Sequence, residues 1–144
     1  MPKVIPFKII ELDAKSFHPT LTGKLGDSII NLILDTGASR TVLSKHITQG
    51  LPVIECEAEE AFAAGVNAQT MEVEQVEIPE ITIGGSTFKN LLVFSANLDG
   101  ISEIYHKMAG QKIDGLIGCD FLVKHKATIN FKMRKIVLYP NNGL

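Results

Sequence analysis

The feature that most constrains this chain is the stretch NLILDTGASRTVLS, residues 31–44, where an apolar run leads directly into Asp35. A short apolar run of this kind is typical of a buried β-strand. A carboxylate that leaves water loses hydration, which raises its pKa unless partners stabilise its charge. The stretch therefore predicts that Asp35 has a partner and a use in chemistry.

The composition bounds the possible classes of protein. The chain has 144 residues, which suits one domain spanning 1–144 with its own core. Its net charge is −2, and its Lys and Arg residues are dispersed among acids, so we expect no nucleic acid as a partner. No apolar run approaches the roughly 20 residues that span a bilayer, and we expect no membrane contact.

The cysteines and histidines carry little further signal. Cys56 and Cys119 lie far apart without CxxC spacing, which favours reduced thiols in a cytoplasmic protein. The residues 1–15 lack the uninterrupted apolar region of a secretory signal. The four histidines fall in separate segments, so the sequence predicts no metal site, and it gives no sign of a cofactor.

Signals for β-strands dominate the chain. We predict one strand over 4–12, a hairpin over 19–37 that turns at Gly26-Asp27, a hairpin that turns at Gly84-Gly85, and a terminal hairpin over 127–140. Two segments favour short helices. In 102–110, Ser102 is the expected N-cap and Gly110 the stop, and in 119–126, Asp120 is the expected N-cap. The sequence thus predicts a mostly-β domain.

A second motif gives the Asp35 stretch its meaning. IDGLIGCDFL, residues 113–122, has an apolar run that ends in a glycine and continues into the second predicted helix. Together with LILDTGAS, residues 32–39, it resembles the retropepsin-like aspartic proteases over 19–138. The resemblance implies an all-β fold, the retropepsin-like acid protease barrel with one or two short helices, and a homodimer.

The resemblance implies that Asp35 is catalytic. Two facing carboxylates that share one proton supply a base for water and an acid for the scissile carbonyl, as aspartic proteases do. The chain has no second DTG, and we expect Asp114 in a turn and Asp120 at a helix cap. The simplest arrangement is a C2 homodimer in which two copies of Asp35 meet on the axis.

The neighbours of Asp35 acquire roles through the same resemblance. Thr36 is expected to brace the two loops across the axis, and the Gly37 amide to donate to the carboxylate. Ala38 would keep the cleft wall small. Ser39 and Arg40 would contact the substrate, although Arg40 fits a solvated surface charge equally well. The segment with Ile117 and Gly118 would cross the DTG strand and support the active site.

The expected substrate is a polypeptide in extended form. Its pockets would be lined by Ile33, Val42, Val66 and Leu116. Ala64, Gly65 and Val66 would belong to a flap, a hairpin that closes over the peptide through exposed backbone groups. A plain surface hairpin with the same glycine is the alternative.

The leading hypothesis is a homodimeric aspartic endopeptidase that forms no covalent acyl-enzyme. The alternatives are a non-catalytic retropepsin-fold module for peptide binding or dimerisation, and a latent enzyme that dimerises only under particular conditions. Residues 3–10 and 134–140 either interleave between subunits or complete the sheet of their own chain. Residues 97–112 either cover the edge of the cleft or alter the interface.

Overall fold

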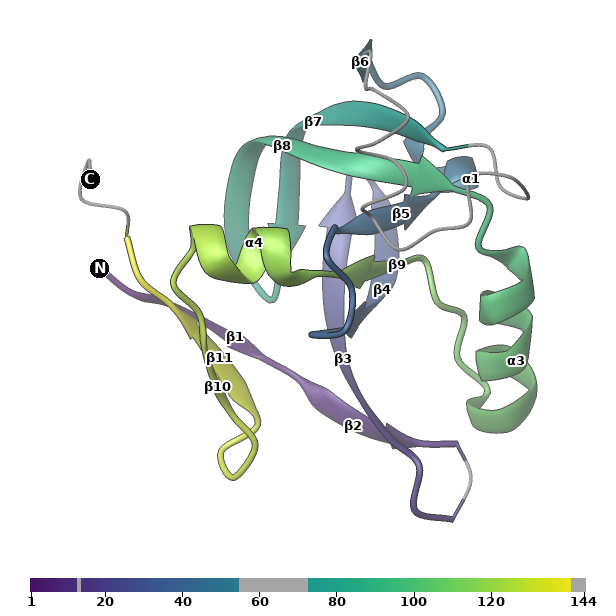
Figure 1. Ribbon diagram of the computed structural model, residues 1–144, viewed down its shortest axis with the longest axis vertical. Helices are drawn as coiled ribbons and strands as arrows, with labels where there is room; N and C mark the ends of the chain where they lie inside the picture. Colours follow the sequence, from purple (N-terminus) through teal and green to yellow (C-terminus); the bar gives the residue numbers. More distant parts are fainter. Residues whose placement is uncertain (13, 55–72, 141–144) are drawn as a thin grey trace.

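The computed structural model describes residues 1–12, 14–54 and 73–140, and most of these lie in β-strands (Figure 1). The described strands are β1 Lys3–Pro6, β2 Lys8–Glu11, β3 Phe17–Leu25, β4 Ser28–Leu34, β5 Val42–Ser44, β6 Val53–Ile54, β7 Glu74–Ile83, β8 Ser86–Ala96, β9 Gly115–Ile117, β10 Thr128–Asn130 and β11 Lys135–Leu138. The described helices are α1 Lys45–Thr48, α3 Asp99–Ala109 and α4 Cys119–Lys124. None of these helices is long and apolar enough to cross a membrane.

The larger sheet closes on itself. Its strand order is β2-β3-β4-β9-β5-β8-β7-β6, and β3 also pairs with β7 through Gly23 and Lys24. The strands β3, β4, β9, β5, β8 and β7 therefore form a barrel, with β2 and β6 attached to it. Gly23 permits the close contact between β3 and β7, because a side chain there would lie 2.7 Å from the carbonyl oxygen of Thr82. The predicted all-β barrel is confirmed.

The predicted strand over 4–12 was wrong in one respect: it is two strands that join different sheets. β1 pairs antiparallel with β11, whereas β2 pairs antiparallel with β3. Between them Phe7 turns into the core, and its backbone N–H donates to the carbonyl oxygen of Arg134. The three-stranded sheet β1-β11-β10 thus joins the two ends of one chain, and the terminal strands complete their own chain's sheet.

The predicted turns lie where glycine allows a left-handed backbone. Gly84 and Gly85 have φ of +57° and +86° between β7 and β8, as a tight hairpin turn requires. Gly26, with φ of +60°, precedes Asp27 in the turn between β3 and β4. The terminal hairpin β10–β11 is also confirmed. These turns fix the registers that face the apolar side chains inward.

The main core fills the barrel and continues beneath the three-stranded sheet. Its side chains are apolar and come from strands of both sheets and from α4, among them Ile5, Leu21, Ile30, Leu32, Ile78, Ile83, Ile117, Phe121 and Ile136. One continuous cluster therefore holds the small sheet and α4 against the barrel. This packing positions the segments on either side of Asp35.

The helix boundaries differ from the sequence prediction. α3 begins at Asp99, earlier than expected, and the backbone N–H of Asp99 donates to Asn97 Oδ1. Ser102 lies inside the helix, where its Oγ accepts a hydrogen bond from the Ile113 backbone. Gly110 does end α3, with φ of +68°. The N-cap position is Leu98, so Ser102 does not cap the helix as predicted.

Candidate active site

The position of Asp35 is set by the pairing of β4 with β9. These strands run parallel, with Leu32 opposite Gly115 and Leu34 opposite Ile117. The ladder continues one step beyond the strand, because the Asp35 backbone N–H donates to the Ile117 carbonyl oxygen at 2.9 Å. β5 pairs with the other edge of β9. β9 therefore lies between β4 and β5, and the loop 35–41, which joins β4 to β5, passes from one edge of β9 to the other. We call this region the crossing.

The loop holds the carboxylate of Asp35 at the surface of the crossing. The Gly37 backbone N–H donates to Asp35 Oδ1 at 2.9 Å, and the Ala38 N–H donates to the Asp35 carbonyl oxygen at 3.1 Å. A Cβ at Gly37 would lie 3.1 Å from the same Oδ1. Asp35 is partly buried, whereas Thr36 and Gly37 are exposed. The carboxylate is thus oriented by backbone and remains accessible to a substrate or to a second chain.

Residues at the start of α4 form hydrogen bonds with the second half of the Asp35 loop. The Gly118 N–H donates to Thr41 Oγ1 at 3.1 Å, and that hydroxyl donates to Asp120 Oδ1 at 2.8 Å. The Cys119 backbone N–H donates to the Ala38 carbonyl oxygen at 2.8 Å. A Cβ at Gly118 would lie 2.6 Å from the Arg40 carbonyl group, so only glycine fits there. Ile117 and Gly118 thus contact the Asp35 loop through backbone.

The two aspartates that flank this segment differ in how they compare with the prediction. Asp120 is the second residue of α4 and not its N-cap, which is Gly118, although its Oδ1 does accept from the Phe121 N–H at 2.8 Å. Asp114 lies directly before β9, as expected, but its side chain is buried. Its Oδ2 accepts from the Asn31 N–H at 2.9 Å, and its Oδ1 lies 3.5 Å from His46 Nε2. Asp114 thus connects its segment to β4 through the Asn31 N–H, and Asp120 connects α4 to the Asp35 loop through the Thr41 hydroxyl.

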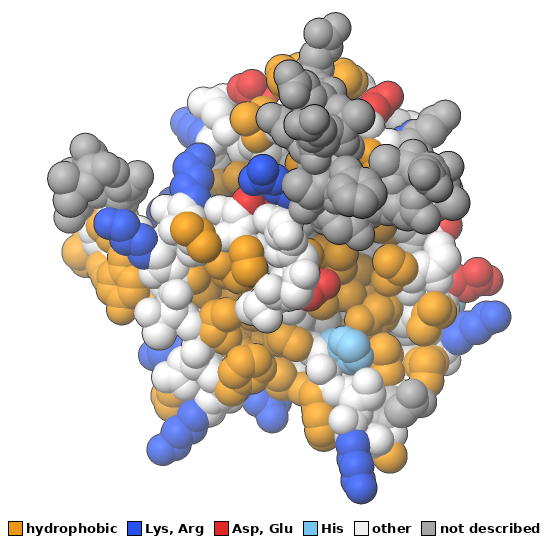
Figure 2. All heavy atoms as spheres, in the orientation of Figure 1, with side chains coloured by type: hydrophobic (Ala, Val, Ile, Leu, Met, Phe, Trp, Pro, Cys, Tyr) orange, Lys and Arg blue, Asp and Glu red, His pale blue; other side chains and the backbone are white. Residues whose placement is uncertain are grey.

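A cleft of about 510 Å³ lies beside Asp35. Its walls are mostly apolar, and they include Phe17, Ile33, Ile101, Leu116 and Phe131. The space-filling view shows apolar side chains gathered between α3 and the β10–β11 hairpin (Figure 2). Ile33 and Leu116, which the sequence predicted as substrate contacts, face this cleft. An apolar cleft that contains one carboxylate suits a ligand with apolar groups.

The cleft also contains a polar pair that sequence reasoning missed. Tyr105 Oη lies 3.0 Å from His18 Nδ1, and His18 Nε2 lies 3.4 Å from Ser16 Oγ. Burial, and secondarily the negative charge of Asp35, raise the pKa of the Tyr105 hydroxyl above 10.0. These residues come from β3 and α3, so no local motif signals their contact. α3 thus covers one edge of the cleft.

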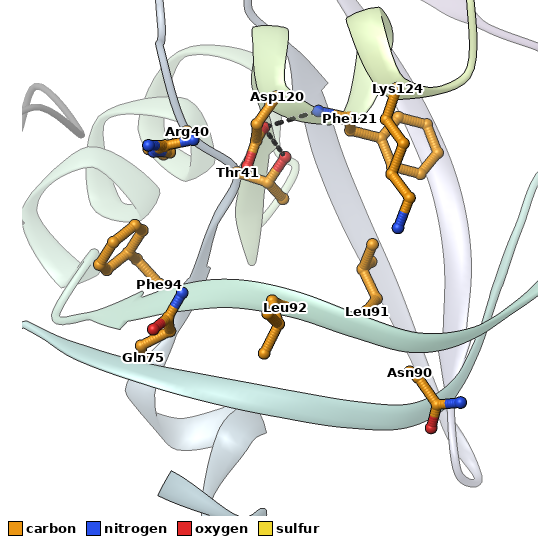
Figure 3. A pocket seen from close by; sticks show the side chains of 10 residues that line it. All are labelled: Arg40, Thr41, Gln75, Asn90, Leu91, Leu92, Phe94, Asp120, Phe121 and Lys124. Carbon is orange, nitrogen blue, oxygen red and sulfur yellow. Dashed lines mark hydrogen bonds between the residues drawn. The ribbon is translucent and has the colours of Figure 1, made fainter. Parts of the chain in front are cut away.

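The other predicted substrate contacts among the described residues do not line this cleft. Arg40 lines a separate groove of about 270 Å³ between β8 and α4, with Gln75, Asn90 and Lys124 (Figure 3). Val42 is buried in a cluster with Phe94, Ala96 and Leu98. Ser39 is exposed and Ala38 is partly buried in the loop. The predicted flap residues Ala64, Gly65 and Val66 lie outside the described residues.

Cys119 carries a free thiol, and its Sγ donates to the Thr36 carbonyl oxygen at 3.1 Å. The other cysteine, Cys56, lies outside the described residues. Within the described part of the chain, no group of three or more His, Cys, Asp or Glu side chains is placed to hold a metal ion.

A family model described as "Aspartyl protease" matches residues 21–121, which include the second part of β3, the Asp35 loop and the start of α4. The chain belongs to this aspartyl protease family. No curated protein matches it in sequence. The predicted family is therefore confirmed, and the match contains the first sequence motif and all but the last residue of the second.

Solved structures show similarity at low sequence identity. The retroviral protease-like domain of Ddi1 from Leishmania major is 17% identical, with a TM-score of 0.50, over 87% of this chain and 96% of that chain. A retropepsin-like aspartic protease from Rickettsia conorii is 19% identical, with a TM-score of 0.45, over 96% of this chain and 94% of that chain. This chain has the retropepsin-like fold.

Proposed function

We propose that this protein is an aspartic endopeptidase that acts as a C2 homodimer, with Asp35 of each subunit on the axis. The observation that carries the proposal is the Asp35 loop. A carboxylate is fixed at the β4–β9 crossing by the Gly37 amide, at the edge of an apolar cleft, with exposed Thr36 beside it. The described residues of one chain bring no second carboxylate into that cleft, and a symmetric partner supplies it.

The chemistry follows from two carboxylates that share one proton. The ionised Asp35 takes a proton from water as the water oxygen attacks the scissile carbonyl carbon, while the protonated Asp35 donates its proton to the carbonyl oxygen. The result is a neutral tetrahedral gem-diol. A carboxylic acid and an amine form when the C–N bond breaks, with one hydroxyl proton returned to a carboxylate and one proton given to the leaving nitrogen. No covalent enzyme intermediate arises.

The substrate in this proposal is a peptide in extended form. Ile33 and Leu116 form the apolar wall nearest Asp35, and Ser39 and Arg40 contact the peptide farther from the scissile bond. Ala38 leaves room for the peptide, and Val42 supports the wall from within the core. Residues 64–66 are proposed as the flap. The cytoplasmic location and the single domain over 1–144 stay predictions.

The experiment compares the wild type with Asp35→Asn on a peptide digest of a denatured proteome, from acidic to neutral pH. The expected result is cleavage by the wild type and a loss of at least about a hundredfold in Asp35→Asn, because an amide cannot act as a general base. Size-exclusion chromatography with light scattering checks that both proteins form the same dimer. A wild-type dimer that cleaves nothing would contradict the proposal and favour a binding module.

A mixing experiment tests the shared site. Asp35→Asn chains added in excess to the wild type convert active dimers into mixed dimers with one carboxylate. The proposal therefore expects cleavage per wild-type chain to fall as Asp35→Asn is added, after time for subunit exchange. The matched control is an excess of Asp27→Asn, because Asp27 lies in the exposed β3–β4 turn. Unchanged cleavage with Asp35→Asn would show that each chain acts alone.

A further inference from the structure

The His18–Tyr105 pair is the part of the cleft that the proposed hydrolysis does not use. Tyr105 comes from α3 and His18 from β3, and both line the same cleft as Asp35. Asp35 and Tyr105 line one continuous cleft, and the charge of Asp35 contributes, after burial, to the raised pKa of the Tyr105 hydroxyl. A hydrogen-bonding group therefore lies in an otherwise apolar wall, next to the reacting groups.

The position of the hydroxyl is fixed by packing. The Tyr105 ring is buried against Ile33 and Ile113, and its edge meets the His18 ring at 5.4 Å between centroids and 81° between planes. Ser102 holds α3 at this place, because its Oγ accepts from the Ile113 N–H at 3.2 Å. A rigid aromatic side chain with its hydroxyl held by a neighbour loses little entropy when it binds a ligand.

The hydroxyl retains hydrogen-bonding capacity after its contact with His18. A phenol donates once and also accepts, and the 3.0 Å contact with His18 Nδ1 uses one of these roles. If Oη donates to Nδ1, its lone pair remains available to a donor. If Nδ1–H donates to Oη, the hydroxyl proton remains available to an acceptor. In either tautomer Tyr105 is able to bind one more neutral polar group.

The charges around the cleft exclude acidic side chains. Its described lining contains no Lys or Arg, and its one carboxylate is Asp35. A substrate carboxylate there would face Asp35 without a compensating cation. An aromatic side chain meets the apolar walls instead, and a volume of about 510 Å³ admits one. A hydroxyl at the tip of that ring would form a hydrogen bond with Tyr105 Oη.

We propose that Tyr105 is a specificity-determining residue, and that the cleft beside Asp35 selects a tyrosine side chain of the peptide over phenylalanine. Tyr105 Oη, oriented by His18 Nδ1, bonds the tyrosine hydroxyl, while Ile33 and Leu116 hold its ring. A site that bonds a substrate hydroxyl discriminates against the analogue that lacks it, because the polar group of the site is then unpaired. The inference rests on the proposed function only in taking the ligand as a substrate side chain.

The test uses two small probes, N-acetyl-tyrosinamide and N-acetyl-phenylalaninamide, with the full chain. Backbone amide shifts in NMR titrations report binding at Ile33 and Leu116. The expected result is that the wild type binds the tyrosine probe about three- to tenfold more tightly, the range of one net hydrogen bond. Tyr105→Phe should reduce this ratio to about one and leave binding of the phenylalanine probe unchanged.

The matched control is Ile104→Ala, on the exposed side of the same helix, which should keep the wild-type ratio. A wild-type ratio of about one, an unchanged ratio in Tyr105→Phe, or no shift at the Ile33 and Leu116 amides would overturn the proposal. Thermal unfolding confirms that each variant is folded. Because the aromatic ring is kept in Tyr105→Phe, a purely structural role would not alter the ratio.

The readouts separate this proposal from the proposed function. Probe binding needs no hydrolysis, so a tyrosine preference in a protein that cleaves no peptide would refute the peptidase and retain the pocket. Cleavage without any tyrosine preference would support the peptidase and refute the tyrosine-selective pocket. If both proposals hold, matched peptides that differ by Tyr and Phe at the preferred position should show a similar three- to tenfold ratio in kcat/KM, lost in Tyr105→Phe.

Discussion

The backbone N–H of Asp35 lies 2.9 Å from the carbonyl oxygen of Ile117, and this hydrogen bond ties the candidate catalytic loop to β9. It extends the β4–β9 ladder to the residue whose side chain faces the cleft. Because both strands contribute side chains to the main core, the packing of the barrel holds the Asp35 carboxylate in place. Changes at the crossing should therefore affect the whole fold as well as Asp35.

Gly118→Ala tests how tightly the crossing is packed. An added Cβ would lie 2.6 Å from the carbonyl carbon and oxygen of Arg40, which are backbone atoms that cannot move freely. We expect the free energy of unfolding to fall by about 1–3 kcal/mol. Urea denaturation measures it. The matched control is Gly100→Ala in α3, which meets nothing within 4 Å and should leave stability unchanged or slightly higher. Equal effects at both sites would contradict the packing argument.

Thr41→Val tests the hydroxyl that joins the loop to α4. Thr41 is 1% exposed, and its Oγ1 accepts from the Gly118 N–H and donates to Asp120. Valine keeps the shape but leaves a buried N–H and a carboxylate short of a partner, at a cost of about 1–3 kcal/mol in unfolding free energy. Thr22→Val, at an exposed position of β3, should change it by no more than about 0.5 kcal/mol. A neutral Thr41→Val would show that the hydroxyl does not stabilise the crossing.

Much of this architecture is readable from the sequence, because the signals are local. Gly84-Gly85 predicts its turn through backbone freedom, and the apolar run before Asp35 predicts a buried strand. The division of 4–12 is not readable in this way. Its alternation continues across Phe7, and only the arrival of β11 beside β1 decides that the chain changes sheets.

The site shows the same limit. Asp35 and Gly37 are adjacent in a motif, so their hydrogen bond follows from the sequence. Tyr105 and His18 are in contact because the fold brings α3 next to β3. Residues so far apart in the chain share no local sequence pattern that could predict this contact. Asn97 is a local signal that the prediction did not use, since a short polar side chain just before a helix can accept a hydrogen bond from a backbone N–H two residues on.

Ile5→Ala tests whether the terminal sheet stabilises its own chain. Ile5 is 0% exposed in β1 and belongs to the main core cluster. Its truncation leaves a cavity, and we expect a loss of about 2–5 kcal/mol in unfolding free energy by urea denaturation. Val4→Ala, at a residue 50% exposed in the same strand, should cost less than about 1 kcal/mol. Similar losses at both positions would contradict this placement of β1.

The ionisation of Tyr105 reports the electrostatics of the cleft. Burial, and then the charge of Asp35, raise the pKa of Tyr105 above 10.0, so the hydroxyl is protonated throughout the neutral range. Asp35→Asn removes the charge but not the burial, and the pKa of Tyr105 should fall while staying above 10.0. The ¹³Cζ shift of Tyr105 in an NMR pH titration measures this. An identical Tyr105 pKa in both proteins would show that the carboxylate does not act on the hydroxyl.

His125 should make the fold sensitive to acid. Its ring lies 4.5 Å from the Phe121 ring and 5.2 Å from the Phe88 ring, centroid to centroid. Burial, and then the positive charges of Lys124 and Lys3, lower the pKa of His125 below 6.5. As the pH falls below 6.5, the unfolded chain therefore takes up a proton that the folded chain resists, and stability decreases until the pH passes the folded pKa.

His125→Phe removes this contribution and keeps a ring between the same neighbours. Urea denaturation at about pH 7.5 and about pH 5.5 should show a smaller loss of unfolding free energy in the variant than in the wild type. His106→Phe, at an exposed position of α3, controls for the loss of one histidine from the chain. If His125→Phe and the wild type lose equal stability between these pH values, the buried imidazole is not the acid-sensitive group.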